Sequence, residues 1–202
     1  MELDPEAHAH PHATGHRWLD LALAFGAFAV SVASIAIALQ NESAMKRLVL
    51  ANSWPYIELS HGNASDGKQV IHFDVRNAGI GPARLDKLVV SYAGQPVSSA
   101  LDLLARCCSD APHGSMDINL VNGRVFAARD EMSFLAVTRS EANAALWDKL
   151  NTERFKVDIG ACYSSVFDEH WITYLRHPKP VPAKDCSELQ GASYDAALYD
   201  AK

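Results

Sequence analysis

The pattern of apolar and polar positions divides the chain into one long apolar run and a later region of short alternating segments. The run covers residues 21–39 (LALAFGAFAVSVASIAIAL) and contains neither a charged residue nor a proline. A helix rises about 1.5 Å per residue, so about 19 residues span roughly 28 Å, which matches the hydrocarbon core of a bilayer. With Trp18 as an interfacial aromatic residue, we expect a transmembrane helix over residues 18–40.

Two polar segments flank this predicted helix. Residues 1–17 are polar and lack apolar periodicity, so they predict a disordered, histidine-rich tail. Residues 41–54 contain good helix formers and no breaker, which predicts that the helix continues as a helical stalk. Residues 36–38 (AIA) resemble a signal-peptidase site. However, the run is longer than the apolar region of a signal peptide and follows an acidic segment, so we expect an uncleaved signal-anchor.

Residues 55–180 alternate apolar and polar side chains over short segments bounded by turn residues. Ile71, Phe73 and Val75, for example, alternate with polar neighbours, as in a strand with one buried face. Roughly seven or eight such segments predict a mainly β domain, an antiparallel immunoglobulin-like β-sandwich with one or two short helices. Residues 181–202 are expected to form a flexible tail. Strands are expected over 56–60, 69–76, 85–92, 117–121, 124–127, 132–138, 154–163 and 169–175, and helices over 99–107 and 140–150.

Three local features of this domain lead to further expectations. The pair Asn122-Gly123 favours positive φ and predicts a type I′ hairpin turn between its flanking segments. Ser140 is expected to cap the second short helix. Phe155 is expected to point into the core, because it alternates with polar neighbours.

The predicted membrane helix has one face of bulky residues and one face of small residues, both at the same helical spacing. Small residues let two helix backbones approach closely, which is how membrane helices associate. Beside contact with the lipid bilayer, we therefore expect self-association or docking on another membrane protein; an ordinary alanine-rich span is the alternative. The small face consists of Ala22, Gly26, Ala29, Ala33 and Ala36, and the bulky face of Leu21, Phe25, Phe28, Val32, Ile35 and Leu39.

The densest turn signal of the domain is the stretch NAGIGPA. Its residues Asn77, Gly79, Gly81 and Pro82 predict a structural corner, because a dinucleotide-binding loop would need a third glycine and a following helix. The two glycines would supply φ values that other residues resist.

Four stretches resemble a group of uncharacterised bacterial proteins that carry one amino-terminal membrane helix before a β-rich domain. They are LVLANSWPYIEL, NAGIGPA, LDLLARCC and YSSVFDEHW. The resemblance runs from the anchor to about Trp171 and implies membrane attachment, with no established activity. In that group the last motif often carries cysteines where this chain has Ser164 and His170.

Charge limits the partners and bears on the side of the membrane. The chain has a formal net charge of −6 and no stripe of Lys and Arg, so we expect no nucleic-acid partner. Lys46 and Arg47 follow the membrane helix whereas Arg17 precedes it. By the positive-inside rule this bias favours a soluble domain in the cytoplasm, with the periplasm as the alternative. The predicted location is the bacterial plasma (inner) membrane, crossed once.

Cysteine and histidine residues are the candidate metal ligands. Four cysteines are too few for a disulfide scaffold in a domain of this size. Cys107, Cys108, Cys162 and His170 could converge on a zinc site, but no Cys-x-x-Cys spacing supports one, and buried apolar cysteines are the simpler interpretation. We predict no bound metal or cofactor, and a Cys162–Cys186 disulfide only for a periplasmic domain. The other candidate ligands lie in the tail: His8, His10, His12 and His16.

Ser164, Ser165, Asp168 and His170 are residue types of a catalytic triad. A triad joins groups from separate elements, which one hairpin cannot easily supply, so polar turn residues are the better interpretation. We therefore predict a non-enzymatic, membrane-anchored binding or assembly module that acts through its sandwich and its membrane helix. A periplasmic sensor or metal-handling protein is the first alternative. A membrane-tethered hydrolase that uses Ser165 and His170 is the second.

Overall fold

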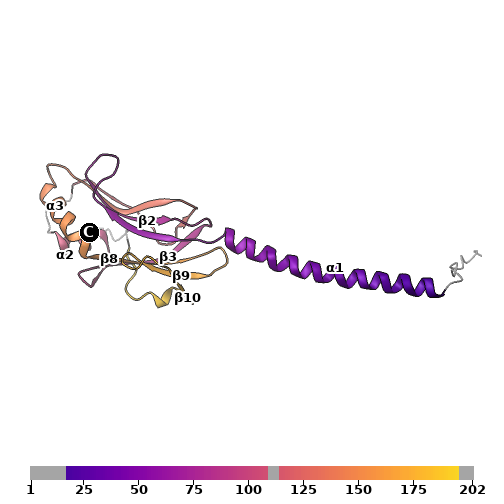
Figure 1. Ribbon diagram of the computed structural model, residues 1–202. Coiled ribbons are helices and arrows are strands. Elements are labelled where there is room, and N and C mark those ends of the chain that lie inside the picture. The colour runs from indigo at the N-terminus through magenta and orange to yellow at the C-terminus, as the bar shows by residue number, and fades with distance from the viewer. Residues whose placement is uncertain (1–16, 109–113, 196–202) are drawn as a thin grey trace, which may run out of the picture. The chain divides into compact units, whose positions relative to one another are not determined.

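The computed structural model describes residues 17–108 and 114–195, which divide into two compact units between Val49 and Leu50. The first unit contains the apolar part of α1, a helix of 36 residues from Arg17 to Asn52 (Figure 1). The most apolar 18-residue window of α1 has a mean hydropathy of 2.3, and none of it is buried. By length and composition, α1 can cross a membrane once, as the apolar run predicts.

Two serine hydroxyls in the apolar part of α1 are hydrogen-bonded within the helix. Ser31 Oγ donates to the Ala27 carbonyl oxygen at 2.8 Å, and Ser34 Oγ donates to the Val30 carbonyl oxygen at 2.8 Å. A hydroxyl bonded to the preceding turn needs no partner in hydrocarbon. The predicted stalk is the continuation of this same helix, which ends at Asn52.

The second unit contains two antiparallel sheets, with α2 and α3 together at one end of them (Figure 1). The four-stranded sheet has the order β1-β2-β7-β5. The six-stranded sheet has the order β10-β9-β8-β3-β4, with β6 also paired to β3. The described residues thus form a mixed structure, which confirms the predicted antiparallel sheets and the long amino-terminal helix. The strands are β1 (Ile57–Gly62), β2 (Val70–Asn77), β3 (Ala83–Tyr92), β4 (Gln95–Val97), β5 (Met116–Ile118), β6 (Val125–Phe126), β7 (Glu131–Thr138), β8 (Val157–Ser164), β9 (His170–Tyr174) and β10 (Val181–Ala183), and the shorter helices are α2 (Ala100–Cys107), α3 (Ala144–Glu153), η1 (Arg154–Lys156) and η2 (Cys186–Glu188).

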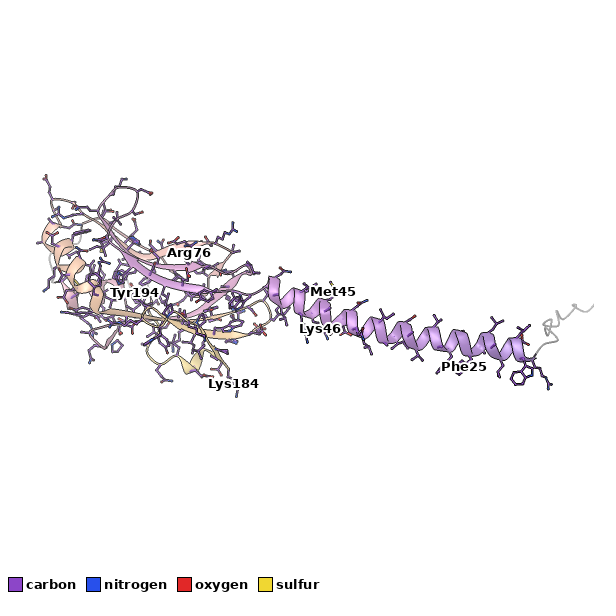
Figure 2. All side chains as sticks on the ribbon, viewed as in Figure 1. Phe25, Met45, Lys46, Arg76, Lys184 and Tyr194 are labelled. Carbon is purple, nitrogen blue, oxygen red and sulfur yellow. A yellow bond between two sulfur atoms is a disulfide. The ribbon has the colours of Figure 1, made fainter. Side chains whose placement is uncertain are left out.

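One main apolar core takes residues from both sheets. Ile71, Phe73 and Val75 of β2 are fully buried, as their alternation predicts, and Tyr163 of β8 belongs to the same cluster. Tyr194, near the end of the described chain, is also buried in this core (Figure 2). Because burial of apolar surface is the main favourable contribution to folding, this core holds both sheets and the carboxy-terminal segment together.

A β-bulge in the six-stranded sheet turns an extra polar residue outward. Leu85 pairs with Tyr163 and Lys87 pairs with Cys162, so Asp86 is the additional residue of β3. Leu85 is fully buried, whereas the Asp86 and Lys87 side chains make their hydrogen bonds on the outer face of the sheet.

A second β-bulge, in the four-stranded sheet, turns an extra apolar residue inward. Phe73 pairs with Leu135 and Asp74 pairs with Ser133, so Phe134 is the additional residue of β7. Phe134 and Leu135 are both fully buried. This bulge therefore enlarges the core.

The corner between β2 and β3 is built around the Asn77 side chain. Its Oδ1 accepts from the N–H groups of Tyr56 and Gly79 at 3.2 and 3.0 Å, and its Nδ2 donates to the Gly81 carbonyl oxygen at 2.8 Å. The expectation that both glycines supply positive φ is wrong, since neither has one. A Cβ at Gly81 would lie 2.2 Å from the Ser53 carbonyl carbon, so glycine here permits a close approach of two backbones.

The prediction of a hairpin turn at Asn122-Gly123 is wrong. The segments on its two sides join different sheets, because β5 pairs with β7 and β6 pairs with β3. Gly123 has a φ of 75°, but Asn122 does not have positive φ, and a type I′ turn needs both. The Asn122 side chain makes tertiary contacts instead: its Oδ1 accepts from the Leu88 N–H at 2.8 Å, and its Nδ2 donates to Ser193 Oγ at 3.1 Å.

Two side chains near α3 also differ from expectation. The helix begins at Ala144, after Asn143, whose Oδ1 accepts from the Ser140 N–H at 2.7 Å, so Ser140 does not cap it. Phe155 is 61% exposed rather than buried. It belongs to η1, before β8 begins, and lies 4.3 Å from the Arg154 guanidinium in a cation–π contact.

The segment after β9 is packed rather than loose. The sequence predicts a flexible tail over 181–202, whereas the described part of this segment forms β10 and η2. Leu189 and Tyr194 are each only 1% exposed. Tertiary contacts order this proline-containing segment, and such contacts leave no periodic pattern in the sequence.

Candidate functional site

A disulfide holds the carboxy-terminal segment on the outer face of the six-stranded sheet. Cys162 of β8 points to this face because its neighbour Tyr163 points into the main core. Its sulfur is bonded to that of Cys186 in η2 at 1.99 Å, with the Cα atoms 5.5 Å apart and a sequence separation of 24 residues. With Ile172 and Leu189, the two cysteines form a second, smaller apolar cluster outside the main core.

Polar side chains gather beside this disulfide. Ser164 of β8 pairs with His170 of β9, so both side chains lie on the same face of the sheet. The bulge brings in Asp86, whose Oδ2 accepts from Ser164 Oγ at 2.6 Å. The atoms of Asp86, His170 and Cys186 that could bind a metal all lie within 4.8 Å of one another. We call these three residues, with Cys162 and Ser164, the outer cluster.

Two basic side chains surround the outer cluster. Arg84 Nε donates to Asp86 Oδ1 at 2.7 Å, and its Nη2 donates to Asp168 Oδ1 at 3.4 Å. The hydrogen bond to Asp86 raises the pKa of Arg84 above its ordinary value. Lys87 Nζ donates to the Leu189 carbonyl oxygen at 2.7 Å, which ties the bulge to the segment that covers it. The cluster therefore combines one carboxylate, one imidazole and a sulfur pair within a cationic rim.

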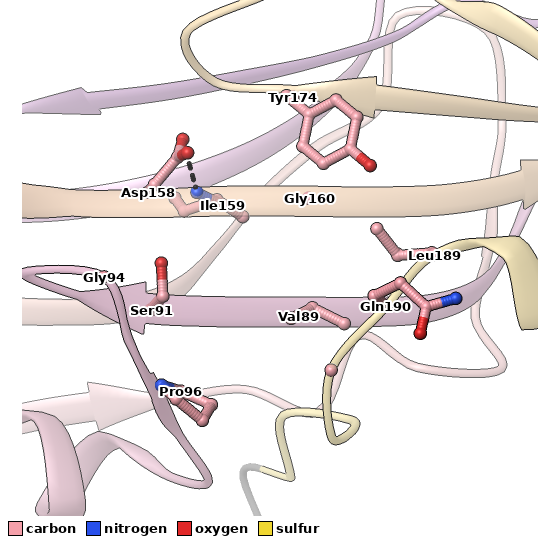
Figure 3. Close-up of a pocket in the computed structure, with 11 residues that line it drawn as sticks. Val89, Ser91, Gly94, Pro96, Asp158, Ile159, Gly160, Tyr174, Leu189 and Gln190 are labelled. Carbon is pink, nitrogen blue, oxygen red and sulfur yellow. Dashed lines mark hydrogen bonds between the residues drawn. The ribbon is translucent and has the colours of Figure 1, made fainter.

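A groove lies on the same outer face. Its volume is about 320 Å³, and Figure 3 shows Tyr174 and Leu189 on either side of Gly160. A Cβ on Gly160 would lie 2.9 Å from Leu189 Cδ1 and 3.0 Å from Tyr174 Cε1, so glycine keeps this wall open. Leu189 belongs to both the groove and the apolar cluster at the disulfide. The groove is lined by Val89, Ser91, Gly94, Pro96, Asp158, Ile159, Gly160, Tyr174, Leu189, Gln190 and Gly191.

The structure does not bring together the four candidate zinc ligands of the domain, Cys107, Cys108, Cys162 and His170. Cys107 and Cys108 are bonded to each other and lie in the main core, whereas Cys162 lies in the smaller apolar cluster on the outer face of the six-stranded sheet. His170 does lie near the Cys162–Cys186 pair. The candidate ligands of the tail, His8, His10, His12 and His16, lie outside the described residues.

The triad-like residues do not form a nucleophile and base system with one another. Ser164 Oγ donates to Asp86, and Ser165 Oγ accepts from the Phe167 N–H at 3.1 Å, as in a turn. Asp168 is paired with Arg84. Ser164, Ser165 and Asp168 therefore each have a partner that is not His170.

A second cluster of the same residue types lies on the outer face of the four-stranded sheet. Asp74 is only 3% exposed, and its carboxylate accepts from Ser133 Oγ at 2.6 Å and from Ser60 Oγ at 3.3 Å. His72 Nδ1 lies 2.5 Å from Asp74 Oδ2. We call these four residues the Asp74 cluster. The carboxylate, not the imidazole, lies in the centre, so His72 is not placed to take a proton from Ser133.

The sequence gives no reason to expect Asp86 in this cluster, because only the bulge turns its side chain to the face of Ser164, and it suggests Cys186 only as a disulfide partner. For the remaining residues the sequence does contain a clue. Cys162 and Ser164 are two residues apart in one strand, so they share a face, and His170 lies in the strand that follows.

The small residues of the predicted association face, Ala22, Gly26, Ala29, Ala33 and Ala36, all lie on α1, and each is exposed. A Cβ on Gly26 would meet nothing within 4 Å. Comparisons with known proteins add no assignment: no family model, no curated protein and no solved structure matches the chain.

Proposed function

We propose that this chain is a single-pass protein of the bacterial plasma membrane whose β domain is a non-enzymatic binding or assembly module on the periplasmic side. One observation carries the proposal: an exposed apolar helix precedes a domain in which Cys162 and Cys186 are joined. A membrane span followed by a disulfide-bonded domain is the arrangement expected of a protein that works outside the cytoplasm.

We prefer the periplasmic side because the Cys162–Cys186 disulfide is stronger evidence than the charge bias around the membrane helix. The excess of Lys46 and Arg47 over Arg17 amounts to about one charge, and Lys46 is paired with Glu42 at 2.6 Å. Cytosolic thiols are kept reduced, whereas a disulfide persists in the periplasm. The sulfur pair is therefore the better guide to sidedness than the charge bias.

An immunoglobulin-like topology is part of this proposal. Such sandwiches place strands A, B, E and D in one sheet and strands C, F and G in the other. If β1, β2, β3, β5, β7, β8 and β9 are read as A, B, C, D, E, F and G, the order β1-β2-β7-β5 corresponds to ABED, and β9-β8-β3 corresponds to GFC. In this interpretation β4 extends the second sheet beside C, and β10 extends it beyond G.

A binding role is supported by the edges of this sandwich. β1 is the end strand of the four-stranded sheet, and an end strand can accept an extended segment of a partner by strand addition. The β10 edge of the six-stranded sheet is less suitable, because β10 has three residues and includes Pro182. We propose that soluble contacts use the β1 edge, and that the small face of α1 recruits a second membrane helix.

The side of the membrane can be tested with carboxy-terminal fusions of the full chain. Alkaline phosphatase is active only after export, and green fluorescent protein folds poorly when exported through the same route. We expect phosphatase activity and no fluorescence. The reverse pattern would place the domain in the cytoplasm and overturn the periplasmic assignment.

Helix association can be tested by co-purification of two differently tagged full-length chains from membranes. Gly26→Ile with Ala29→Ile fills the small face and should reduce recovery of the second copy. Phe28→Ile with Val32→Ile changes the bulky face and is the matched control. Equal recovery with both pairs would remove the small face as a contact. If wild-type chains do not co-purify, chemical cross-linking in membranes should identify a different membrane protein whose recovery shows the same dependence.

A second candidate function, a metal-handling periplasmic protein, is favoured by a specific observation. Asp86, His170 and Cys186 have their donor atoms close together on a partly exposed face. The amino-terminal histidines suggest a similar role from composition alone.

A further inference from the structure

We propose that the outer cluster is a redox-gated site for a zinc-class divalent cation. Cys162, Cys186, His170 and Asp86 are its ligands when the disulfide is reduced, and the site is closed when the disulfide is formed. The proposal does not depend on the side of the membrane, since the cluster lies within the domain itself.

The donor set suits such a cation. Zinc is bound by thiolate sulfur, imidazole nitrogen and carboxylate oxygen, in most structural sites with four ligands arranged as a tetrahedron. Zinc–ligand distances of about 2.0–2.3 Å place neighbouring ligands about 3.5 Å apart. The donor atoms of Asp86, His170 and Cys186 already lie within 4.8 Å of one another, and the Cys162 sulfur is bonded to the last of them. To bind a cation, the donor atoms of Asp86, His170 and Cys186 must approach one another by about 1 Å, and the two sulfur atoms, bonded at 1.99 Å in the disulfide, must separate to about 3.7 Å after reduction.

Four separate segments deliver these ligands, and each is fixed by a different feature of the fold. The bulge turns Asp86 outward, and the pairing of Ser164 with His170 places the imidazole on the same face. Cys162 is fully buried in β8, whereas the Cys186 side of the cluster is partly exposed. A cation can therefore enter from solvent.

Neighbouring groups orient the carboxylate without occupying all of its acceptor positions. Ser164 Oγ bonds one oxygen of Asp86, and Arg84 Nε bonds the other. Each carboxylate oxygen has a further lone pair for a metal. Such outer partners hold a ligand in position and tune the site. With two thiolates and Asp86 against a divalent cation, Arg84 brings the local charge to zero.

Reduction is the step that opens the site. An external dithiol exchanges with the Cys162–Cys186 bond: the S–S bond breaks, the dithiol becomes a disulfide, and its two electrons and two protons give two cysteine thiols. Binding of one divalent cation then forms two metal–sulfur bonds and releases the two thiol protons to solvent. In the oxidised chain neither sulfur is a thiolate, so the strongest ligands are missing.

The test uses Co²⁺ alone as the probe, added to full-length chain in detergent after reduction with a phosphine. To isolate this sulfur pair, Cys107 and Cys108 are both changed to Ser in every sample. We expect one equivalent of Co²⁺ to give a sulfur-to-cobalt charge-transfer band and tetrahedral d–d bands, both absent from the oxidised chain. The charge-transfer band reports sulfur ligation, so binding by the amino-terminal histidines does not contribute to it.

Variants separate this site from nonspecific thiol binding. His170→Ala should weaken Co²⁺ binding by at least the roughly 10–100-fold that loss of an outer partner costs, and Asp86→Asn should also weaken it. His177→Ala, at an exposed position outside the cluster, is the matched control and should bind like the parent. Circular dichroism of each sample checks that the domain remains folded.

A second measurement uses the same parent and variants. Zn²⁺ should slow alkylation of Cys162 and Cys186 in the reduced parent and the His177→Ala chain, but much less in His170→Ala. Three results would overturn the proposal: equal Co²⁺ spectra before and after reduction, equal affinities of the His170→Ala and His177→Ala chains, or no protection from alkylation by Zn²⁺.

Discussion

The two outer faces of the β domain carry the same three residue types in different settings. On the four-stranded sheet, Asp74 is almost fully buried and is bonded by Ser133 and by His72 at 2.5 Å. On the six-stranded sheet, Asp86 has a side chain that is 21% exposed and is bonded by Ser164, with His170 nearby. Among the described residues, only the second face also carries a disulfide and a segment that covers it, residues 186–191 (the covering segment).

The difference between the two faces shows why the same residue types can have all their hydrogen bonds satisfied on one face and leave side chains available to a ligand on the other. A buried carboxylate is tolerated when its hydrogen bonds are satisfied, and in the Asp74 cluster the imidazole is already engaged by that carboxylate. In the outer cluster the Asp86 partners are Ser164 and Arg84, and His170 is left beside the sulfur pair. The first arrangement stabilises a sheet, and the second leaves donors for a ligand.

Loss of the disulfide that holds the covering segment should have the largest effect on stability. Changing Cys162 and Cys186 to Ser should lower the free energy of unfolding by about 3.5 kcal/mol, because a loop closed across 24 residues restricts the unfolded chain. Changing Cys107 and Cys108 to Ser is the control, since adjacent residues close no long loop and the loss should be much smaller. Chemical denaturation of the full chain in detergent measures both. Equal losses would mean that the disulfide does not hold the second face together.

The next largest effect on stability compares substitutions of the two aspartates. Asp74→Ala should lower the free energy of unfolding by about 2–3 kcal/mol, because it leaves Ser133 and His72 without their buried partner. Asp86→Ala in the oxidised chain should lower the free energy of unfolding by less, about 1–2 kcal/mol, because the ion pair with Arg84, which is 47% exposed, contributes little and the main loss is the hydrogen bond from the buried Ser164 hydroxyl. The two variants are matched in chemistry and differ only in setting. A larger loss for Asp86→Ala would reverse the comparison.

A smaller effect concerns how closely the segment covers its face. Gly160→Ala places a methyl group 2.9 Å from Leu189 Cδ1, so we expect a loss of about 1 kcal/mol and faster hydrogen exchange over residues 186–191. Ser91→Ala, on the same groove, adds no atom and is the control. Unchanged exchange in the Gly160→Ala chain would show that Leu189 has room to move.

The smallest expected effect is a pH dependence of the free energy of unfolding. It arises from the carboxylate of Glu153, which lies outside both clusters. Hydrogen bonds from Lys156 and Tyr92 lower the pKa of Glu153 to about 2 from its ordinary value of 4.5. The ionised form therefore stabilises the fold fully above about pH 4.5, and this contribution disappears as the pH falls towards 2. Glu153→Gln should be less stable than the parent at pH 7, with the difference shrinking below pH 4.5. A constant difference across that range would contradict the assignment.

Much of the fold could be predicted from local patterns. The alternation of Ile71, Phe73 and Val75 places β2 and its buried face, because a strand turns successive side chains to opposite sides. The helix over residues 99–107 was predicted within a residue, since Ser99 is an N-cap whose side chain accepts from the Asp102 N–H. Gly79 and Gly81 mark a corner, although close backbone contact, and not φ, is the reason for glycine.

Errors arose where a short signal was overruled by distant partners. Asn122-Gly123 resembles a hairpin turn, but its flanking segments pair with β3 and β7, and Leu88 and Ser193 bond the Asn122 side chain. The segment beyond residue 181 has no periodicity, and a disulfide and the burial of Leu189 order it. Long-range contacts of this kind have no local pattern in one sequence.

The long apolar helix, the strand-rich character of the domain and most strand positions follow from the polarity of neighbouring residues along the chain. Which sulfur atoms are joined and which residues share a face depend instead on how distant segments pack together. Asp86 reaches Ser164 through a bulge, and Cys186 reaches Cys162 across 24 residues. Such approaches are set by strand register and packing, which involve the whole chain at once.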